Sequence, residues 1–365
     1  MRSSTLILLI LLLLPSCISE QGNSLQLNNR FISPERRITK SYINYIEAIN
    51  SSGIPISSCQ PDYDQNSKSI ISRKLQTDKD LQYFPATLWQ LYSFDGNSKW
   101  KCIAESLNEI IQMPDIAFQS GNGELIQNTL LTQYRITGDR KYYKILIESL
   151  NQQVSDSKPV NILSFSSDDG AEIPIDKLLE NELLFFASRE TGDPIYRKLA
   201  IAQSDQIYRL HFRNNLSNNV FYGLASKDRL PGIMDLENLE SYDLYNLSLS
   251  FYGFTILFNE LGDDRYGELA FNLARLFTSI FEGDNMTIRE NLDLTSRTLI
   301  CLAISRLSKG SDASYEATSE RIFKSLLGNL DLLPGADDYQ YSFRMYYYLF
   351  ECLKQGDDSY IGYKN

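Results

Sequence analysis

Apolar residues recur every three or four positions along most of the chain, with polar residues between them. This spacing gathers the apolar side chains on one face and is typical of amphipathic α-helices. Strict alternation of apolar and polar residues, which indicates half-buried strands, is scarce. We therefore expect an all-α protein, with a first helix that begins at Ser33-Pro34-Glu35 and further helices over residues 84–92, 100–111, 124–135, 141–153, 175–190, 194–211, 242–260, 264–281, 295–307, 314–327 and 342–354.

One short motif recurs between these expected helices: glycine, then aspartate, then an aromatic residue that opens the next apolar run. It occurs at Gly138-Asp139, Gly192-Asp193 and Gly262-Asp263, with looser copies at Asp95-Gly96-Asn97 and Gly310-Ser311-Asp312. Glycine tolerates the left-handed conformation that ends a helix, and aspartate caps the helix that follows. Any all-helical protein reuses good turn chemistry, but the recurrence at the length of a helix pair favours stacked helical hairpins.

About twelve helices in consecutive antiparallel pairs can close into a ring, an (α/α)6 toroid. In such a ring the inner helices bury one face on the axis, and their ends open a central cavity. Residues 35–365 are expected to form this single domain, because repeat architectures of this size occur as one unit. Catalytic groups are expected to line the cavity, which is the concave site that the fold provides.

The N-terminus predicts export. Arg2 precedes an apolar run over residues 6–14, and this length suits a secretory signal rather than a membrane span. Leu14-Pro15-Ser16-Cys17 looks like a bacterial lipobox, in which the cysteine receives lipid. The alternative is an ordinary signal peptide with a chance cysteine.

On the lipobox interpretation, residues 1–16 are a signal peptide and the mature chain begins at a lipidated Cys17. The polar segment 17–34 then serves as a flexible tether. Several acyl chains anchor a protein stably, so we expect a lipoprotein of the bacterial cell envelope that faces the periplasm or the cell surface.

Charge and cysteine spacing exclude two classes of partner. The net charge of −11 and the lack of a basic stripe argue against nucleic acid, since phosphate binding needs clustered Lys and Arg. No C-x-x-C pair occurs and the single His211 has no Cys or His nearby, so a zinc site is not expected. Cys102, Cys301 and Cys352 lie in apolar runs and are expected to be small core residues; together with Cys59 they leave the disulfide state open.

Carboxylates remain the best candidates for catalysis. The single histidine, His211, does not lie at a plausible site, so Ser-His-Asp and Cys-His arrangements are not expected, and no phosphate or dinucleotide motif is present. Asp115 and Asp176 are each a lone acid among apolar residues at the start of an expected helix. From position alone, capping of that helix is the commoner role for such an aspartate.

A series of segments resembles glycoside hydrolase family 88, the unsaturated glucuronyl hydrolases, when the segments are taken in order. These are 84–92 (FPATLWQLY), 115–118 (DIAF), 134–142 (YRITGDRKY), 175–176 (ID), 185–197 (FFASRETGDPIYR) and 252–254 (YGF). The resemblance implies an (α/α)6 fold and hydration of the double bond in a 4,5-unsaturated uronic acid, the sugar end left by polysaccharide lyases. It implies neither a metal nor an organic cofactor.

The same resemblance assigns roles to the two acids. Asp115 and Asp176, 61 residues apart, match the family's two aspartates. It implies that Asp176 is the general acid/base and that Asp115 holds the substrate and modulates the pKa of Asp176. A carboxyl group kept protonated near neutral pH needs an apolar setting or a nearby like charge.

Several family residues are replaced in this chain. Pro114 stands where the family has His, and residues 244–249 (LYNLSL) lack the Arg that would pair with the uronate carboxylate. Phe165 stands where a Trp is expected, and Lys177 follows Asp176 in place of Asn. The candidate substrate-binding residues are therefore Trp89, Phe165 and Lys177, where Lys177 either supplies a replacement cation or forms an ion pair with Glu180 or Glu182.

The resulting expectation is a lipoprotein glycosidase that removes an unsaturated uronic acid from oligosaccharides. Two alternatives stay open. One is a non-catalytic glycan-binding or scaffold lipoprotein that keeps the toroid but has lost substrate-holding residues. The other is a different (α/α)6 glycosidase or lyase that acts on unmodified or rhamnogalacturonan-type sugars.

Overall fold

The computed structural model of the protein describes residues 33–51, 59–64, 69–74, 83–111, 123–156, 175–212, 241–282, 292–307, 313–329 and 339–354. The chain divides into two compact units, one formed by Met1–Ser149 with Leu327–Asn365 and the other by Leu150–Leu326. None of the helices in the described ranges has the length and apolar character that crossing a membrane requires.

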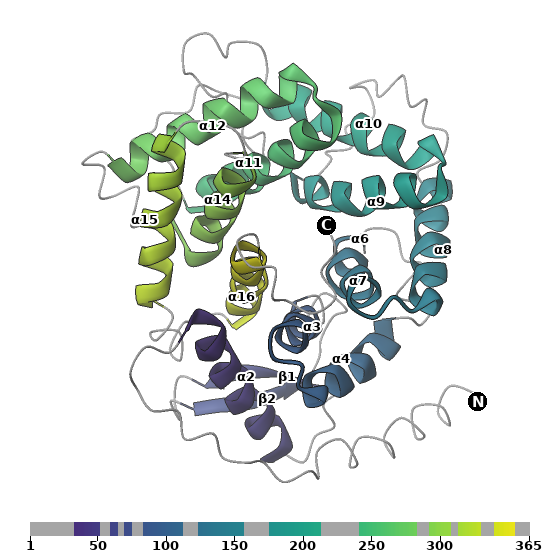
Figure 1. The fold of residues 1–365 in the computed structure, drawn as a ribbon, viewed down its shortest axis with the longest axis vertical. Helices are drawn as coiled ribbons and strands as arrows, with labels where there is room; N and C mark the ends of the chain where they lie inside the picture. The colour runs from purple at the N-terminus through teal and green to yellow at the C-terminus, as the bar shows by residue number, and fades with distance from the viewer. Residues whose placement is uncertain are drawn as a thin grey trace. The chain divides into compact units, whose positions relative to one another are not determined.

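The first unit contains helices from both ends of the sequence and a small sheet (Figure 1). Its elements are α2 (Pro34–Ser51), β1 (Cys59–Asp64), β2 (Ser69–Lys74), α3 (Phe84–Asp95), α4 (Ser98–Ile111), α6 (Gly123–Ile126), the π-helix η3 (Gln127–Leu131), α7 (Thr132–Thr137) and the C-terminal α16 (Tyr339–Lys354). Helix α3 packs against α4, α7 and α16. Helix α8 (Arg140–Asp156) continues from this unit into the second.

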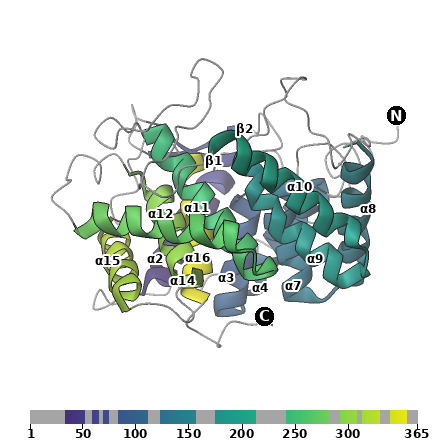
Figure 2. The ribbon, with the colours of Figure 1, turned by 90° about the horizontal axis from the view of Figure 1, so that it is seen from above.

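The second unit is built from consecutive helices. They are the 3-10 helix η5 (Ile175–Glu180), α9 (Asn181–Thr191), α10 (Pro194–His211), α11 (Ser241–Leu261), α12 (Asp264–Glu282), α14 (Leu294–Leu307) and α15 (Ala313–Asn329). Helix α11 packs against α12, α14 and η5, and α9 packs against α10; the latter pair runs side by side in Figure 2. Each helix expected from the sequence is present.

The recurring motif forms the turns as predicted. The four glycines that follow α3, α7, α9 and α11 have φ between 65 and 72°, the left-handed region: Gly96, Gly138, Gly192 and Gly262. The next residue accepts a hydrogen bond on its side chain from the N–H two positions later, at 2.8 to 3.0 Å: Asn97, Asp139, Asp193 and Asp263. Each turn thus ends one helix and caps its successor. The copy at Gly310 lies outside the described residues.

Burial alternates along the chain. Helix α3 buries nine of its residues, and α14 buries ten on all sides, whereas α12 buries one face and exposes charged residues such as Glu268 and Arg275. In chain order, the largely buried α11 is followed by the amphipathic α12. This order is expected of hairpins in which one helix faces the core of the domain and the next covers it.

Strands β1 and β2 form an antiparallel pair that was not predicted. Cys59 pairs with Lys74 and Asp64 with Ser69, and the pair packs against α2. Polar residues and Pro61 in β1 conceal any alternating pattern, and proline is disfavoured in paired strands. The segments where the sequence suggested short hairpins, 164–170 and 214–219, lie outside the described residues.

The cysteines correct one expectation. Cys102, predicted to be a small core residue, is half-buried in α4 and disulfide-bonded. Cys301 and Cys352 form no disulfide; Cys301 is buried as predicted, and Cys352 is half-buried. A sequence pattern reveals that a cysteine lies on an apolar helix face, but it does not reveal what approaches that face from elsewhere in the chain.

Candidate active site

The structure describes three of the predicted site residues. Trp89 lies in the first unit, and Asp176 and Lys177 lie in the second. Asp115, Phe165 and the lipidation residue Cys17 lie outside the described residues, so their roles stay predictions.

Asp176 is an exposed carboxylate in the first turn of η5. Its neighbours Ile175 and Leu178 are buried, with 7% and 0% of their surface exposed. The two apolar side chains hold the 3-10 turn against the unit, and the aspartate between them faces solvent. An exposed acid at the entrance to a helix is free to meet a ligand.

Lys177 forms an ion pair within the same turn. Its Nζ lies 2.6 Å from Oε1 of Glu180, and Glu180 is only 6% exposed. The sequence left two roles open for Lys177, a cation for the substrate or an ion pair with a nearby glutamate, and the structure contains the ion pair with Glu180. The lysine charge is therefore partly neutralised by a nearly buried carboxylate.

A buried polar network joins η5 to the helices that follow. The Gln203 amide donates to the backbone oxygen of Lys177 at 3.1 Å and to Oδ1 of Asn181 at 2.7 Å. Asn181 in turn donates to the hydroxyl of Ser204 at 2.9 Å. Because unpaired buried amides are costly, this network fixes the position of the turn that carries Asp176.

The other side of η5 lies against α11 at a glycine. A Cβ built on Gly253 would lie 2.5 Å from Cβ of Leu178. Only a residue without a side chain allows this approach. Gly253 belongs to one of the segments that carry the family resemblance. The close contact with Leu178 explains why a glycine occupies this position of the segment.

Trp89 is a core residue in this structure. Its side chain is 0% exposed in α3 and meets the Tyr92 ring edge-on at 6.2 Å. Its indole N–H has no hydrogen-bond partner among the described residues. The ring is thus packed inside the first unit and is not presented to solvent as a stacking platform.

Helix α11 has the half-buried Tyr245 where the resemblance would place an arginine, and leucines on either side of it supply apolar packing. Leu244, Leu247 and Leu249 are each at most 1% exposed. These leucines belong to the core of the second unit. The segment that holds substrate in the family thus contributes leucines to packing in this chain.

A cluster in the first unit was missed by the sequence analysis. Tyr83, directly before α3, donates a hydrogen bond from its hydroxyl to Glu124 in α6, and the Arg344 guanidinium of α16 lies over the Tyr83 ring. The sequence feature that could have indicated this cluster is a single arginine within the aromatic run 343–348 (FRMYYY). The three residues are far apart in the sequence, so no local pattern joins them.

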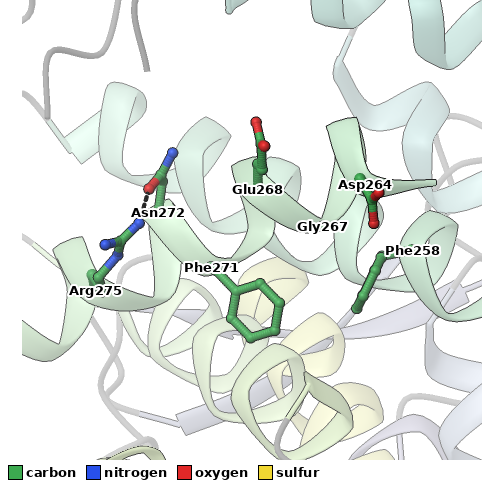
Figure 3. Close-up of a pocket in the computed structure, with 7 residues that line it drawn as sticks. All are labelled: Phe258, Asp264, Gly267, Glu268, Phe271, Asn272 and Arg275. Carbon is green, nitrogen blue, oxygen red and sulfur yellow. Dashed lines mark hydrogen bonds between the residues drawn. The ribbon is translucent and has the colours of Figure 1, made fainter. Parts of the chain in front are cut away.

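The structure also has a groove of about 640 Å³ along α12 (Figure 3). Among the described residues it is lined by Phe258, Asp264, Gly267, Glu268, Phe271, Asn272 and Arg275. Glu268 and Asn272 point to one side of the helix and the Phe271 ring to the other, while Arg275 donates to Asn272. None of the predicted site residues that the structure describes, Trp89, Asp176 and Lys177, is among these lining residues.

The chain resembles unsaturated glucuronyl hydrolases in sequence. It is 24% identical over 205 residues to the unsaturated glucuronyl hydrolase of Formosa agariphila. The match covers 50% of this chain, and it spans about half (48%) of the relative's length. No protein-family model matches the chain.

Solved structures show the same relationship over most of the fold. The unsaturated glucuronyl hydrolase of Bacillus sp. GL1 superposes with a TM-score of 0.67 and 16% identity, covering 91% of this chain and 99% of that one. The enzyme from Streptococcus agalactiae gives 0.65 and 16%, covering 92% and 95%. An unsaturated glucuronyl hydrolase specific for heparin gives 0.63 and 18%, covering 88% and 96%.

The chain therefore has the (α/α)6 fold of the unsaturated glucuronyl hydrolases. The predicted fold class is confirmed, with the β1–β2 pair as an addition. The predicted resemblance to these glycosidases is confirmed as well, as that of a divergent relative.

Proposed function

We propose that the protein is a glycosidase of the unsaturated glucuronyl hydrolase type. Its substrate is an oligosaccharide that ends in a 4,5-unsaturated uronic acid. The observation that carries the proposal is the agreement of two likenesses, one in sequence and one in fold, with the same class of enzyme. The two aspartates at matching positions, Asp115 and Asp176, add to it.

The proposed chemistry is hydration of the double bond. A general acid protonates the vinyl ether carbon while a base activates a water molecule. The resulting hemiketal then collapses and frees the neighbouring sugar. Asp176 is the acid/base in this scheme, and a positioned group of this kind contributes about 10² to 10⁴-fold to the rate.

Asp176 is accessible to a substrate, although its exposed setting is not the apolar one expected of a proton donor. The side chain is exposed, and the turn that carries it is held by buried leucine, glutamine and asparagine residues. Such support keeps a catalytic group in place without covering it. Asp115 is proposed to hold the sugar and to modulate the acid.

A second candidate function is glycan binding without turnover. It is favoured by Tyr245 in place of the family arginine and by the pairing of Lys177 with Glu180. Both features weaken the grip on a uronate at the expected positions. The toroid would then serve as a binding or scaffold domain.

One assay separates the two functions. Purified protein is mixed with unsaturated oligosaccharides, including dGlcA-GalNAc6S and dGlcA-Glc-Rha-Glc, which appear bound in related solved structures, and a heparin-derived disaccharide. Loss of the ultraviolet absorbance of the double bond reports turnover. Decay supports the enzyme, whereas binding without decay supports the second function.

We further propose that the protein is an envelope lipoprotein anchored through Cys17. The Leu14-Pro15-Ser16-Cys17 sequence and the disulfide of Cys102 support this, because disulfides persist in oxidising compartments outside the cytoplasm. Expression in a bacterium fed an alkyne fatty acid should label the wild type and leave Cys17→Ser unlabelled. Equal labelling of the two would overturn the anchor.

A further inference from the structure

The groove along α12 is a surface feature of the second unit that the proposed glycosidase chemistry does not use. Its lining residues are Phe258 of α11 and residues of α12 that share one face of the helix, from Asp264 to Arg275 (Figure 3). All of these residues belong to the second unit. The volume of about 640 Å³ lies in the range of clefts that take up a ligand or side chains of a partner.

Two phenylalanines form the apolar part of the groove. The rings of Phe258 and Phe271 meet edge-on with their centroids 5.8 Å apart, and both side chains are half-buried. In α12, all of whose residues are described, Phe271 is the only apolar side chain that is not buried. An aromatic ring left at a groove, on a helix that buries its other apolar residues, is typical of an interaction surface.

Opposite charges stand on either side of Phe271 along the helix. Glu268 precedes it by three residues and Arg275 follows it by four, and both charged side chains are exposed. They are two helical turns apart, about 10 Å along the axis, whereas ion pairs within a helix join residues three or four apart. Among the described residues, Arg275 donates to the Asn272 side chain, and neither Glu268 nor Arg275 forms an ion pair.

This order of charges is complementary to its own reverse. Glu268 and Arg275 are equally far from a point between Phe271 and Asn272. When a second copy of α12 lies antiparallel to the first about a two-fold axis through that point, Arg275 of each copy faces Glu268 of the partner subunit. Because each contact of a two-fold interface occurs twice, two such ion pairs would flank the two Phe271 rings.

The charges of the groove favour a second copy over an acidic sugar as its occupant. Its lining carries the two carboxylates of Asp264 and Glu268 against the single guanidinium of Arg275. This excess of negative charge disfavours the uronate oligosaccharides proposed as substrates. A second α12 supplies what the surface can pair with: a guanidinium for the carboxylates, a carboxylate for the guanidinium and an aromatic ring for the apolar part.

We propose that the protein binds a second copy of itself through this groove, in a two-fold dimer with the two α12 helices antiparallel. The Phe271 ring of each copy enters the groove of the other, and Arg275 pairs with Glu268 of the partner subunit. One helix face is smaller than the about 800 Å² per partner of a typical stable interface, so the dimer is weak and depends on concentration. The inference goes beyond the proposed glycosidase function and does not rest on it.

Analytical ultracentrifugation of the purified full-length protein measures the association. Between about 1 and 500 µM, the range expected of a weak interface, the wild type should pass from monomer to dimer. Phe271→Ala should raise the Kd of the dimer by about tenfold, because it removes the ring that enters the partner's groove. A wild type that stays monomeric throughout, including one whose groove binds an oligosaccharide or another protein instead, would overturn the proposal.

Charge reversal tests the pairing directly. Arg275→Glu sets a carboxylate against each Glu268, and Glu268→Arg sets a guanidinium against each Arg275. Either variant alone should therefore raise the Kd of the dimer by at least about 100-fold. An equimolar mixture of the two variants restores opposite charges at both pairs and should associate about as well as the wild type. A mixture that associates no better than its components would contradict the antiparallel arrangement.

Arg197 provides a matched control. It is an exposed arginine of α10 in the same unit and does not line the groove. Arg197→Glu changes the net charge by the same amount as Arg275→Glu and should leave the Kd of the dimer unchanged. Thermal unfolding shows that each variant is folded. Equal weakening by the two substitutions would mean that overall charge controls association, and it would overturn the assignment of the groove.

Discussion

The side-chain amide of Gln90 donates a hydrogen bond of 2.8 Å to the carboxylate of Glu351. The same carboxylate oxygen accepts from Lys354 at 3.3 Å, and the Lys354 side chain is only 2% exposed. Residues from α3 and from the C-terminal α16 thus share a buried charge pair. This pair joins helix α16 to helix α3 within the first unit.

Breaking this pair is expected to be costly. Glu351→Gln leaves Lys354 buried beside a neutral amide and should lower the free energy of unfolding by about 3 to 5 kcal/mol. Glu351→Gln combined with Lys354→Met removes both charges and should recover most of the loss. Urea denaturation of the three proteins measures the difference; a double variant as unstable as the single one would contradict this account.

Gly253 is expected to control the position of Asp176. Alanine in the middle of α11 would favour the helix by about 1 kcal/mol. Its Cβ would, however, fall 2.5 Å from Cβ of Leu178 and push η5 away, at a cost of about 1 to 3 kcal/mol. Gly253→Ala should therefore be less stable and should lose activity in the folded fraction.

Gly267→Ala is the matched control for Gly253→Ala. Its Cβ would meet the Phe258 ring at 2.7 Å, so it also strains the packing of α11 and α12, but η5 is not involved. This variant should lose stability with kcat nearly unchanged. Equal losses of kcat in the two variants would show that the turn with Asp176 is not specifically displaced.

Asp263 is expected to stabilise the protein in a pH-dependent way. The hydrogen bond from Arg265 lowers the pKa of Asp263, and the two side chains pair at 2.7 Å. Because the pKa is lower in the folded state, the stabilisation is present above the ordinary pKa of aspartate, about 3.9, and is lost as the pH falls through the folded value.

Asp263→Asn keeps the cap and removes the charge. We expect it to cost less than about 1 kcal/mol at pH 7, as exposed pairs do, and the difference to disappear near pH 2 to 3. Repeating Asp263→Asn in an Arg265→Gln background is the control and should show a smaller pH dependence, because Arg265 is the main cause of the lowered pKa of Asp263. Urea denaturation from pH 7 to pH 2.5 measures both, and a difference that grows in acid would refute the assignment.

The disulfide of Cys102 should contribute to stability. Its reduction is expected to lower the free energy of unfolding by about 2 to 4 kcal/mol. A reductant should therefore lower the Tm of the wild type and have no further effect on Cys102→Ser. Cys301→Ser, which changes a free cysteine, should respond to the reductant as the wild type does.

Local chemistry explains what the sequence could predict. The turns at Gly138 and Gly192 were predictable because a left-handed glycine and a capping aspartate lie next to each other in the chain. Helix positions were predictable because the spacing of apolar residues that marks a helix is also a local property of the sequence. Asp176 was found as a lone acid at the start of a helix and is exposed there.

Long-range contacts explain what the sequence could not predict. Tyr83 and Arg344 are far apart in the sequence, and only folding brings them together. The burial of Trp89 depends on helices that pack around α3, not on its own neighbours. The π-helix η3 interrupts a run of residues 124–135 that reads as one continuous helix.

The most direct test of the account is the decay of double-bond absorbance with purified full-length protein and unsaturated uronyl oligosaccharides. Asp115→Asn and Asp176→Asn are measured alongside the wild type, with thermal unfolding to show that each is folded. The account predicts decay in the wild type and a loss of about 10² to 10⁴-fold in the Asp176 variant. A folded wild type that leaves every substrate intact, or a folded Asp176→Asn as active as the wild type, would contradict it.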